Sequence, residues 1–301
     1  MKILTSVIGS YPPLDLAGKP VTLEQAVQAQ LDAGIDVIST GQLTGDMIEI
    51  FASKIGSVRP AQDGDGKWPF TVFGELSWPE NGTTLLEHKA ASMRLLNNSH
   101  NGKKPAIQLK GIVTGPYTLA SACNNRFYKS EQELASAFAF VLNKELVALS
   151  EVADVLQIDE PSFCNGVPKY IRNVFDTLVK DVKKEIILHA HYGRTTPTDL
   201  LEILALPVQT ISYDSAANPI VLDLLAKHKV KQDASVGCIM TDGNYLTGVN
   251  TIAGRIRRAA RILGEGKIRY VTPDCGMRNL HQNTANQIMR RLVAARDSVS
   301  Q

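Results

Sequence analysis

The chain has 301 residues, of which 44% are hydrophobic and 21% charged, so it can bury a large core and should fold throughout. Its 32 basic and 30 acidic residues leave a net charge of +2 and are scattered without blocks. This pattern argues against nucleic acid and membrane surfaces as partners, and it favours chemistry on a small molecule.

Short β-rich apolar runs alternate with longer segments of helical period. The N-terminal segment MKILTSVIGSYPP lacks the long apolar region of a signal peptide, and we interpret it as the first strand. No stretch is long enough to span a membrane. We expect strands at residues 3–9, 36–40, 107–113, 155–159, 186–191, 209–213, 232–237 and 268–272.

Amphipathic helices are expected between these strands, the clearest over residues 22–34, where Gly34 supplies a stop. Others are expected over residues 130–151, 250–266 and 283–297. About eight strand and helix repeats over this length predict an α/β fold, the (β/α)8 TIM barrel, with an open doubly wound sheet as the competing arrangement. No linker is visible, so residues 1–301 are interpreted as a single TIM-barrel domain.

One section, between Phe51 and Lys104, interrupts this alternation. It contains a loop rich in Gly, Pro and Asp (SVRPAQDGDGKWP), an alternating run (FTVFGELSW) and a helical segment (LLEHKAASMRLLNN). We interpret residues 51–104 as an inserted hairpin over one mouth of the barrel.

The four cysteines lie far apart and form no Cys-x-x-Cys pair: Cys123, Cys164, Cys238 and Cys275. A chain of this length needs no disulfides to fold, so a reducing, cytoplasmic setting is expected.

Polar residues collect just past the predicted strands, where the chemistry of a TIM barrel is located. They include Ile8-Gly9-Ser10, Gly41-Gln42, Thr114-Gly115-Pro116, Asp159-Glu160-Pro161, His191, Asp214, Thr241-Asp242 and Asp274-Cys275-Gly276. Their convergence predicts an active site at the C-terminal ends of the strands.

Three of these residues form a ligand set that suits Zn²⁺, namely His191, Asp214 and Cys275. Three protein ligands would leave one tetrahedral position open, as in a catalytic zinc site. His189, two residues before His191 on the same strand, is either a deeper group near this site or a hydrogen-bonded core histidine.

Two further groups are candidates for holding a substrate. Asp159 and Glu160 can bind an ammonium group or support a histidine, the alternative being a solvated acidic loop. Ser10, behind Gly9, can bind a carboxylate through its hydroxyl and backbone N–H groups, although Gly-Ser is also a common turn pair.

Six segments, in this order along the chain, resemble the catalytic C-terminal barrel of the cobalamin-independent methionine synthases: SVIGSYP, GDMIEIFASKIG, VTGPYT, LQIDEPSFCNGVP, LHAH and VTPDCGMR. The chain resembles a single-barrel core member, within the superfamily that also includes uroporphyrinogen decarboxylase. The resemblance implies a zinc-dependent methyltransferase of methionine biosynthesis that transfers a methyl group to homocysteine or a related small thiol.

The resemblance also implies roles for individual residues. His191 and Cys275 match two of the family's zinc ligands, and Asp214 matches its glutamate, whereas Gly193 stands where the family has a cysteine. Asp159 matches an acid that binds the amino group of homocysteine, and Ile8, Gly9 and Ser10 match the segment that meets the amino-acid end. Gln42 stands where the family has a second amine-binding acid.

The segment MTDGNY lacks the histidine with which the folate-using members protonate the leaving pterin, so Asp242 becomes the candidate catalytic acid. This departure predicts a donor other than polyglutamyl methyl-folate, and a corrinoid or a donor protein stays open. Cys238 could supply the missing sulfur, and Tyr192 and Tyr213 could instead close the pocket over a chemistry without metal.

Two alternatives to methyl transfer stay open. One is another thiol transferase or lyase on the same barrel, such as addition of a thiol to an epoxide or a decarboxylase-like reaction. The other is a metal-free homologue with a binding role.

Overall fold

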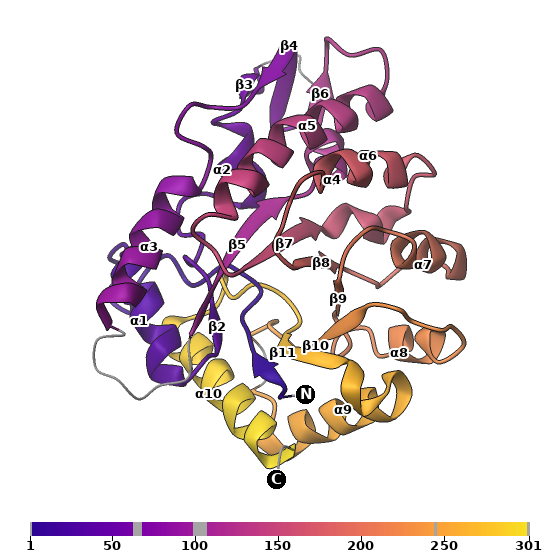
Figure 1. Cartoon of the computed structure of the whole chain (residues 1–301). Helices are drawn as coiled ribbons and strands as arrows, with labels where there is room; N and C mark the ends of the chain where they lie inside the picture. The colour runs from indigo at the N-terminus through magenta and orange to yellow at the C-terminus, as the bar shows by residue number, and fades with distance from the viewer. Residues whose placement is uncertain (1, 63–67, 99–106, 244–245, 300–301) are drawn as a thin grey trace.

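The computed structural model describes residues 2–62, 68–98, 107–243 and 246–299. Eight strands form one parallel sheet in the order β1-β11-β10-β9-β8-β7-β5-β2. A parallel bridge between Ser6 and Val37 joins the two edge strands β1 and β2, so the sheet closes on itself. The predicted TIM barrel is therefore confirmed, and Figure 1 shows its helices arranged around the strands.

Each barrel strand overlaps one of the eight predicted segments, although β1 and β2 are shorter than predicted. Their bounds are β1 (Leu4–Thr5), β2 (Val37–Ile38), β5 (Gln108–Thr114), β7 (Val155–Glu160), β8 (Ile186–Ala190), β9 (Thr210–Tyr213), β10 (Asp233–Ile239) and β11 (Ile268–Pro273).

The α-helices lie between the strands and after the last one. They are α1 (Leu23–Ala33), α2 (Met47–Ala52), α3 (Leu85–Asn98), α4 (Pro116–Ser121), α5 (Glu131–Leu149), α6 (Ile171–Leu178), α7 (Pro197–Leu204), α8 (Ile220–Leu225), α9 (Val249–Leu263) and α10 (Gln282–Val299). Short 3-10 helices cover Pro161–Asn165 and Glu265–Lys267.

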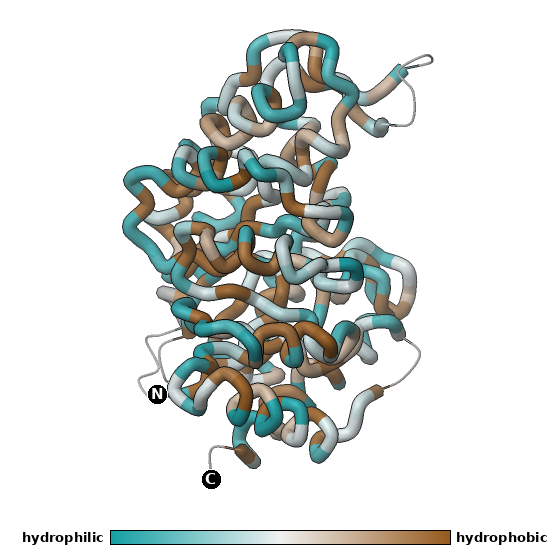
Figure 2. The backbone as a smooth tube through the Cα atoms, turned by 90° about the vertical axis from the view of Figure 1, so that its right-hand side faces the viewer, coloured by the Kyte–Doolittle hydropathy of each residue, from teal (hydrophilic) through white to brown (hydrophobic). Residues whose placement is uncertain are grey.

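The local signals at α1 explain its bounds. Thr22 and Gln25 form a reciprocal capping box at the start, and Gly34 adopts a left-handed φ of 81° at the end. Figure 2 shows hydrophilic and hydrophobic stretches alternating along the tube, as amphipathic elements require. In the described part of the chain, no helix has the length and apolar character needed to cross a membrane.

The predicted hairpin is present, but its position differs from the expectation. Strand β3 (Gly56–Pro60) pairs antiparallel with β4 (Phe70–Ser77), and β4 pairs in parallel with β6 (Cys123–Asn125). Figure 1 shows this small sheet beside α5, away from the barrel strands. Trp78, directly after β4, donates from Nε1 to Oε2 of Glu145 on α5 at 2.8 Å. The hairpin thus packs on an outer helix, and none of its described residues lines the pocket at the barrel mouth.

The interior of the barrel changes from apolar to polar along the strands. Its lower layer is a separate apolar cluster, made of Val37, Val155, Ile187 and Tyr270 with Leu4 packed against it. Side chains two apart on a strand point to the same side, and the buried residues two positions further on are polar: Ser6, Ser39, Gln157, His189 and Thr272. This layering leads from a hydrophobic floor to a polar site.

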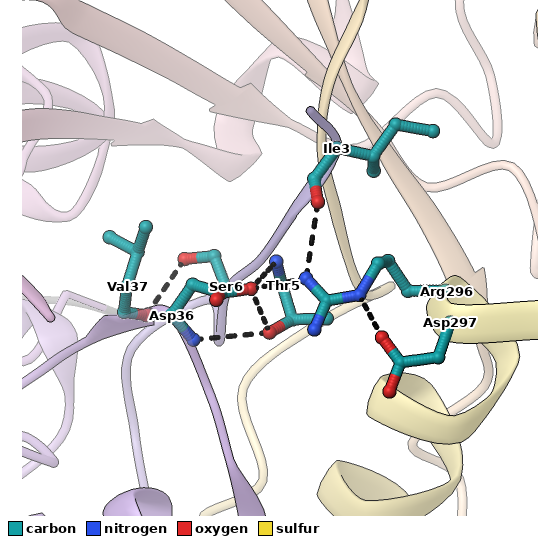
Figure 3. Close-up of polar contacts among 7 residues, drawn as sticks. All are labelled: Ile3, Thr5, Ser6, Asp36, Val37, Arg296 and Asp297. Carbon is teal, nitrogen blue, oxygen red and sulfur yellow. Dashed lines mark hydrogen bonds and ion pairs between the residues drawn. The ribbon is translucent and has the colours of Figure 1, made fainter. Parts of the chain in front are cut away.

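A polar cluster closes the seam between the first two strands (Figure 3). The Asp36 carboxylate accepts hydrogen bonds from the backbone N–H and the hydroxyl of Thr5, each at 2.8 Å, and it pairs with Arg296 of α10. Arg296 also donates to the carbonyl of Ile3. The last helix therefore ties the start of the chain to the segment before β2.

Candidate active site

A cavity of about 210 Å³ lies at the C-terminal ends of the barrel strands. Six residues predicted from the sequence line it: Ile8, Ser10, Gln42, Asp159, His191 and Cys275. His189 lines it as well, together with Gly45, Asp46, Met47, Ile50, Pro161, Gly276, Arg278 and Asn279. The barrel thus brings together side chains from the ends of β1, β2, β7, β8 and β11, as its topology requires.

His191 lies between a sulfur and a carboxylate. Its Nε2 is 3.7 Å from Sγ of Cys275, and its Nδ1 is 3.2 Å from Oδ2 of Asp214. Asp214 and Cys275 therefore face opposite edges of one imidazole ring. The hydrogen bond with Asp214, followed by the contact with Cys275, raises the pKa of His191 to about 10 and outweighs the opposing effect of burial.

Asp214 is fixed by the loop that follows β9. Its Oδ2 also accepts from Nδ2 of Asn218 at 2.6 Å and from the backbone N–H of Tyr192 at 3.3 Å. Its other oxygen is buried without a hydrogen-bond partner among the described residues. Asp274, just before Cys275, accepts from the N–H groups of residues 216 and 217, so the strand end that carries Cys275 also holds this loop in place.

The predicted set of three zinc ligands does not fit this geometry. Among the described residues, no group of three His, Cys, Asp or Glu side chains is arranged to hold a metal ion. The reason is that Asp214 bonds to Nδ1, the ring nitrogen turned away from Cys275. The expectation that Asp214 is a zinc ligand beside Cys275 is therefore corrected, because its carboxylate contacts the other edge of the imidazole ring.

Two donors do fit one ion. Zinc bonds to nitrogen and sulfur are about 2.0–2.3 Å long, so an Nε2 to Sγ separation of 3.7 Å can be bridged by one zinc ion. Of the three predicted ligands, His191 and Cys275 thus lie within the span of one zinc ion, whereas Asp214 lies behind the histidine.

His189 lies one layer deeper than His191. Its Nδ1 is 3.2 Å from Oγ of Ser212, and its Nε2 is buried without a partner among the described residues. The two imidazole rings are 5.2 Å apart. Burial and the neighbouring charge of His191 hold the pKa of His189 well below its usual range, so it is a neutral core histidine at the pocket wall.

Gly193 and Cys238 are the two positions considered for a further sulfur ligand, and they lie in different surroundings. Gly193 is exposed, and a Cβ added there would meet only the side chain of Asn218, at 3.3 Å. Cys238 is fully buried, lies 3.5 Å from the carbonyl oxygen of Thr272 and does not line the pocket. Its thiol is packed in the core, where burial raises its pKa.

Close packing shapes the end of the pocket near Ser10. A Cβ on Gly276 would lie 2.1 Å from Oγ of Ser10, so a larger residue there would require the Ser10 hydroxyl to move. A Cβ on Gly9 would lie 2.5 Å from Oε1 of Gln42. Gln42 has a left-handed φ of 44°, and its Nε2 is buried without a partner among the described residues. An unused donor therefore lies beside the pocket.

The two neighbouring acids of β7 point to opposite sides of the strand. Asp159 lines the pocket, and its Oδ1 accepts from Nε2 of Gln157 at 2.6 Å. Glu160 does not line it. Its carboxylate accepts from the N–H groups of Tyr117 and Thr118 and from the Thr118 hydroxyl, at the start of α4. The expectation that both acids hold the substrate is corrected, because successive side chains on a strand alternate.

Asp242 lies in the loop after β10 and is exposed. It does not line the pocket. Its catalytic role stays a prediction.

Sequence reasoning did not identify Arg278, which lines the pocket and donates from Nη1 to the carbonyl of Gln42 at 3.0 Å. It also missed Gln157 and Asn218, which hold Asp159 and Asp214. The sequence signal for Gln157 was its position two residues before Asp159 on the same strand, which places both side chains on one face.

Comparisons with known proteins agree with this architecture. Residues 18–297 match the family model described as the catalytic domain of cobalamin-independent synthase. The methionine synthase of Methanothermobacter marburgensis is 29% identical over 303 residues, which cover 97% of this chain and 92% of that protein. The 5-methyltetrahydropteroyltriglutamate–homocysteine methyltransferase of Thermotoga maritima is 26% identical, covering 90% of this chain but 38% of that protein.

The fold is also found in a solved structure. A B12-independent methionine synthase from Shewanella sp. W3-18-1 is similar with a TM-score of 0.84, at 20% identity, over 100% of this chain and 98% of that chain.

Proposed function

The chain belongs to the family of cobalamin-independent synthase catalytic domains, and from this premise we propose that it methylates the sulfur of homocysteine or of a closely related small thiol. The observation that carries the proposal is the 3.7 Å approach of Cys275 Sγ to His191 Nε2 beside the pocket that Asp159 and Ser10 also line. Relatives of similar length named methionine synthase support it.

The acceptor would bind by its three functional groups. Its sulfur would lie beside Cys275 and His191, its ammonium group would pair with Asp159, and its carboxylate would meet the Ser10 hydroxyl and nearby N–H groups, with Ile8 and Gly9 completing that wall. The buried Nε2 of Gln42 offers one more donor to an oxygen of the acceptor. Glu160 has no part in this proposal because its carboxylate caps α4.

We also propose that His191 and Cys275 hold a zinc ion, with Asp214 orienting the imidazole through Nδ1. When bound, zinc lowers the pKa of a coordinated thiol and so favours its deprotonated form. The chain's own residues position the reaction: Asp214 leaves Nε2 facing the pocket, and Ile8, Met47 and Ile50 provide apolar contacts there. Methyl transfer then forms the sulfur–methyl bond as the bond between the methyl group and its donor breaks.

We propose a methyl donor other than polyglutamyl methyl-folate. The chain matches nearly the full length of the relatives named simply methionine synthase, but only 38% of those named for that folate. Residues 239–246 also contain no histidine. Asp242, exposed near the barrel mouth, would suit a donor that approaches from outside, such as a corrinoid or a donor protein.

A direct assay tests the proposal. The purified protein, loaded with zinc, is incubated with homocysteine and with either methylcobalamin or methyl-folate, and methionine is measured by mass spectrometry. We expect methionine with homocysteine, and more of it with methylcobalamin. Absence of methylation with both donors, together with no homocysteine binding by calorimetry, would contradict the proposal. Stronger binding of an amine-free thiol than of homocysteine would favour the alternative thiol chemistry.

A further inference from the structure

A lysine is enclosed within the barrel below the pocket. Lys110, on β5, is 1% exposed. Its ammonium group donates to three oxygens: the carbonyl of Val7, the hydroxyl of Ser6 at 3.3 Å and Oε1 of Gln157 at 2.5 Å. It does not line the pocket, so a substrate cannot touch it directly.

Gln157 connects this lysine to the pocket. Its Oε1 accepts from Lys110, and its Nε2 donates to Oδ1 of Asp159 at 2.6 Å and to the carbonyl of Ile8 at 2.9 Å. All hydrogen-bonding capacity of the amide nitrogen is used. Asp159 lines the pocket, and the described residues provide no donor other than Gln157 to its carboxylate.

The direction of the hydrogen bonds from Lys110 through Gln157 to Asp159 follows from the donors and acceptors that each side chain has. A lysine ammonium has donors only, so the oxygen of the Gln157 amide must face it. The amide NH₂ group then faces Asp159, whose Oδ1 accepts the hydrogen bond. An ionised carboxylate accepts this bond more strongly than a neutral carboxyl, so the contact favours the carboxylate. Without the lysine, the amide could turn over and present its oxygen to Asp159, where only a protonated carboxyl would bond.

We infer that Lys110 is a positioning residue for the acceptor's ammonium group, which it serves through Gln157 by holding Asp159 as an oriented carboxylate. The inference rests on the proposed function, because it assigns Asp159 to that ammonium group. This role would give the pocket a binding preference for a thiol with an amino group over the same thiol without it.

The charges support this arrangement. Burial lowers the pKa of Lys110 and raises that of Asp159, and in each case the opposite charge of the other residue counteracts burial. Each group thus helps the other to stay ionised in a low-dielectric interior.

The alternative is that Lys110 only stabilises the fold by linking β5 to β7 and to the segment after β1 through hydrogen bonds. Such a link would affect all ligands alike, whereas a group acting on Asp159 affects only ligands with an amine. The test therefore compares homocysteine with 4-sulfanylbutanoic acid, which differs only in lacking the amino group. Dissociation constants are measured by calorimetry on the full-length protein, so the result does not depend on turnover or on the methyl donor.

The variants are Lys110→Met, Asp159→Asn and the double variant, with Lys54→Met as control. Lys54 donates to the carbonyl of Thr83, outside the pocket. We expect Lys110→Met to reduce the preference for homocysteine by at least about tenfold, as for a charged hydrogen bond. In the Asp159→Asn background the same substitution should cause no further loss. Lys54→Met should keep the wild-type preference.

Each other outcome has a definite meaning. Equal weakening of both thiols by Lys110→Met, or an unchanged preference, would overturn the inference while leaving the proposed function intact. A wild-type protein that binds neither thiol contradicts the proposed function itself, and this inference with it. Circular dichroism checks that Lys110→Met is folded. If it is not, Gln157→Met, which removes the hydrogen-bonded link to Asp159 but keeps the lysine, must show the same loss of preference for homocysteine.

Discussion

Nε2 of His191 faces Sγ of Cys275 at 3.7 Å, while Nδ1 of the same ring faces Oδ2 of Asp214 at 3.2 Å. The sulfur and the carboxylate thus have different tasks. Cys275 lines the pocket and can contact a ligand or an ion, whereas Asp214 is 1% exposed and contacts His191 only at the far edge of the imidazole ring.

Replacing Cys275 by serine should remove both zinc binding and thiol methylation. The substitution keeps the size of the side chain but exchanges sulfur for a hydroxyl, which is a poor zinc ligand at neutral pH. We expect activity to fall by more than about 100-fold, because groups that only orient metal ligands already contribute about 10- to 100-fold. Zinc content by plasma emission spectroscopy and the rate of methionine formation are the measurements.

The matched control is Cys164→Ser, because Cys164 is a free cysteine that does not line the pocket. It should retain zinc and activity. Full activity in Cys275→Ser would contradict the placement of the acceptor sulfur.

Replacing Asp214 by asparagine should weaken zinc binding without abolishing it. His191, Asn218 and Tyr192 all contact Oδ2, so the amide oxygen of asparagine can take that place, but it carries no full negative charge. The imidazole loses its charged partner, and we expect zinc affinity and kcat to fall by about 10- to 100-fold. Competition with a chromogenic chelator measures the affinity.

Asp223→Asn is the control, since Asp223 forms an exposed ion pair with Arg258 on the outer surface. If Asp214→Asn lost zinc as completely as Cys275→Ser, Asp214 would have to be a direct ligand after all.

A cysteine at position 193 should strengthen zinc binding. The backbone there is not in the left-handed region, and the nearest atom to the added Cβ is Oδ1 of Asn218 at 3.3 Å, so a small shift of that side chain accommodates the substitution. A thiolate two residues after His191, if its side chain reaches the ion, should raise the zinc affinity by about tenfold or more. Gly193→Ser provides the control, with the same shape but no sulfur. Equal affinities in Gly193→Cys and Gly193→Ser would show that this position does not reach the ion.

The sequence predicted the barrel well because apolar strands and amphipathic helices alternate with little interruption. It also placed His191 and Cys275 at the same end of the barrel, which follows from topology alone. It did not predict which ring nitrogen faces Asp214, because that depends on how the loop carrying Asn218 folds. Lys110 escaped notice because a single lysine in an apolar run gives no sign of the oxygens that surround it in three dimensions.

The alternation of side chains along β7 gives a similar lesson for the two acids after Ile158. Asp159 and Glu160 look equivalent as a sequence pair, but one enters the pocket and the other caps α4. The two-residue period of a strand is enough to separate them, since it puts Gln157 and Asp159 on one side of β7 and Glu160 on the other.

The seam formed by Asp36 and Arg296 should make the stability of the fold sensitive to acid. Burial raises the pKa of Asp36, but the hydrogen bonds from Thr5 and Arg296 outweigh it, and the pKa lies below its ordinary value. The unfolded chain therefore binds this proton more readily than the folded one. The stabilisation is fully present above the ordinary pKa of about 4 and is lost as the pH falls through the lower, folded value.

Asp36→Asn should accordingly lower the free energy of unfolding at pH 7 by about 1.5–3 kcal/mol, the usual contribution of a hydrogen bond to a charged group. The difference from the wild type should begin to shrink near pH 4, where the carboxyl of the unfolded chain takes up its proton, and it should disappear below the lower pKa of the folded carboxyl. Urea unfolding followed by circular dichroism at pH 7 and pH 3 measures it, with Asp223→Asn as the surface control. A difference that stays the same at both pH values would mean that Asp36 contributes through its shape and not through its charge.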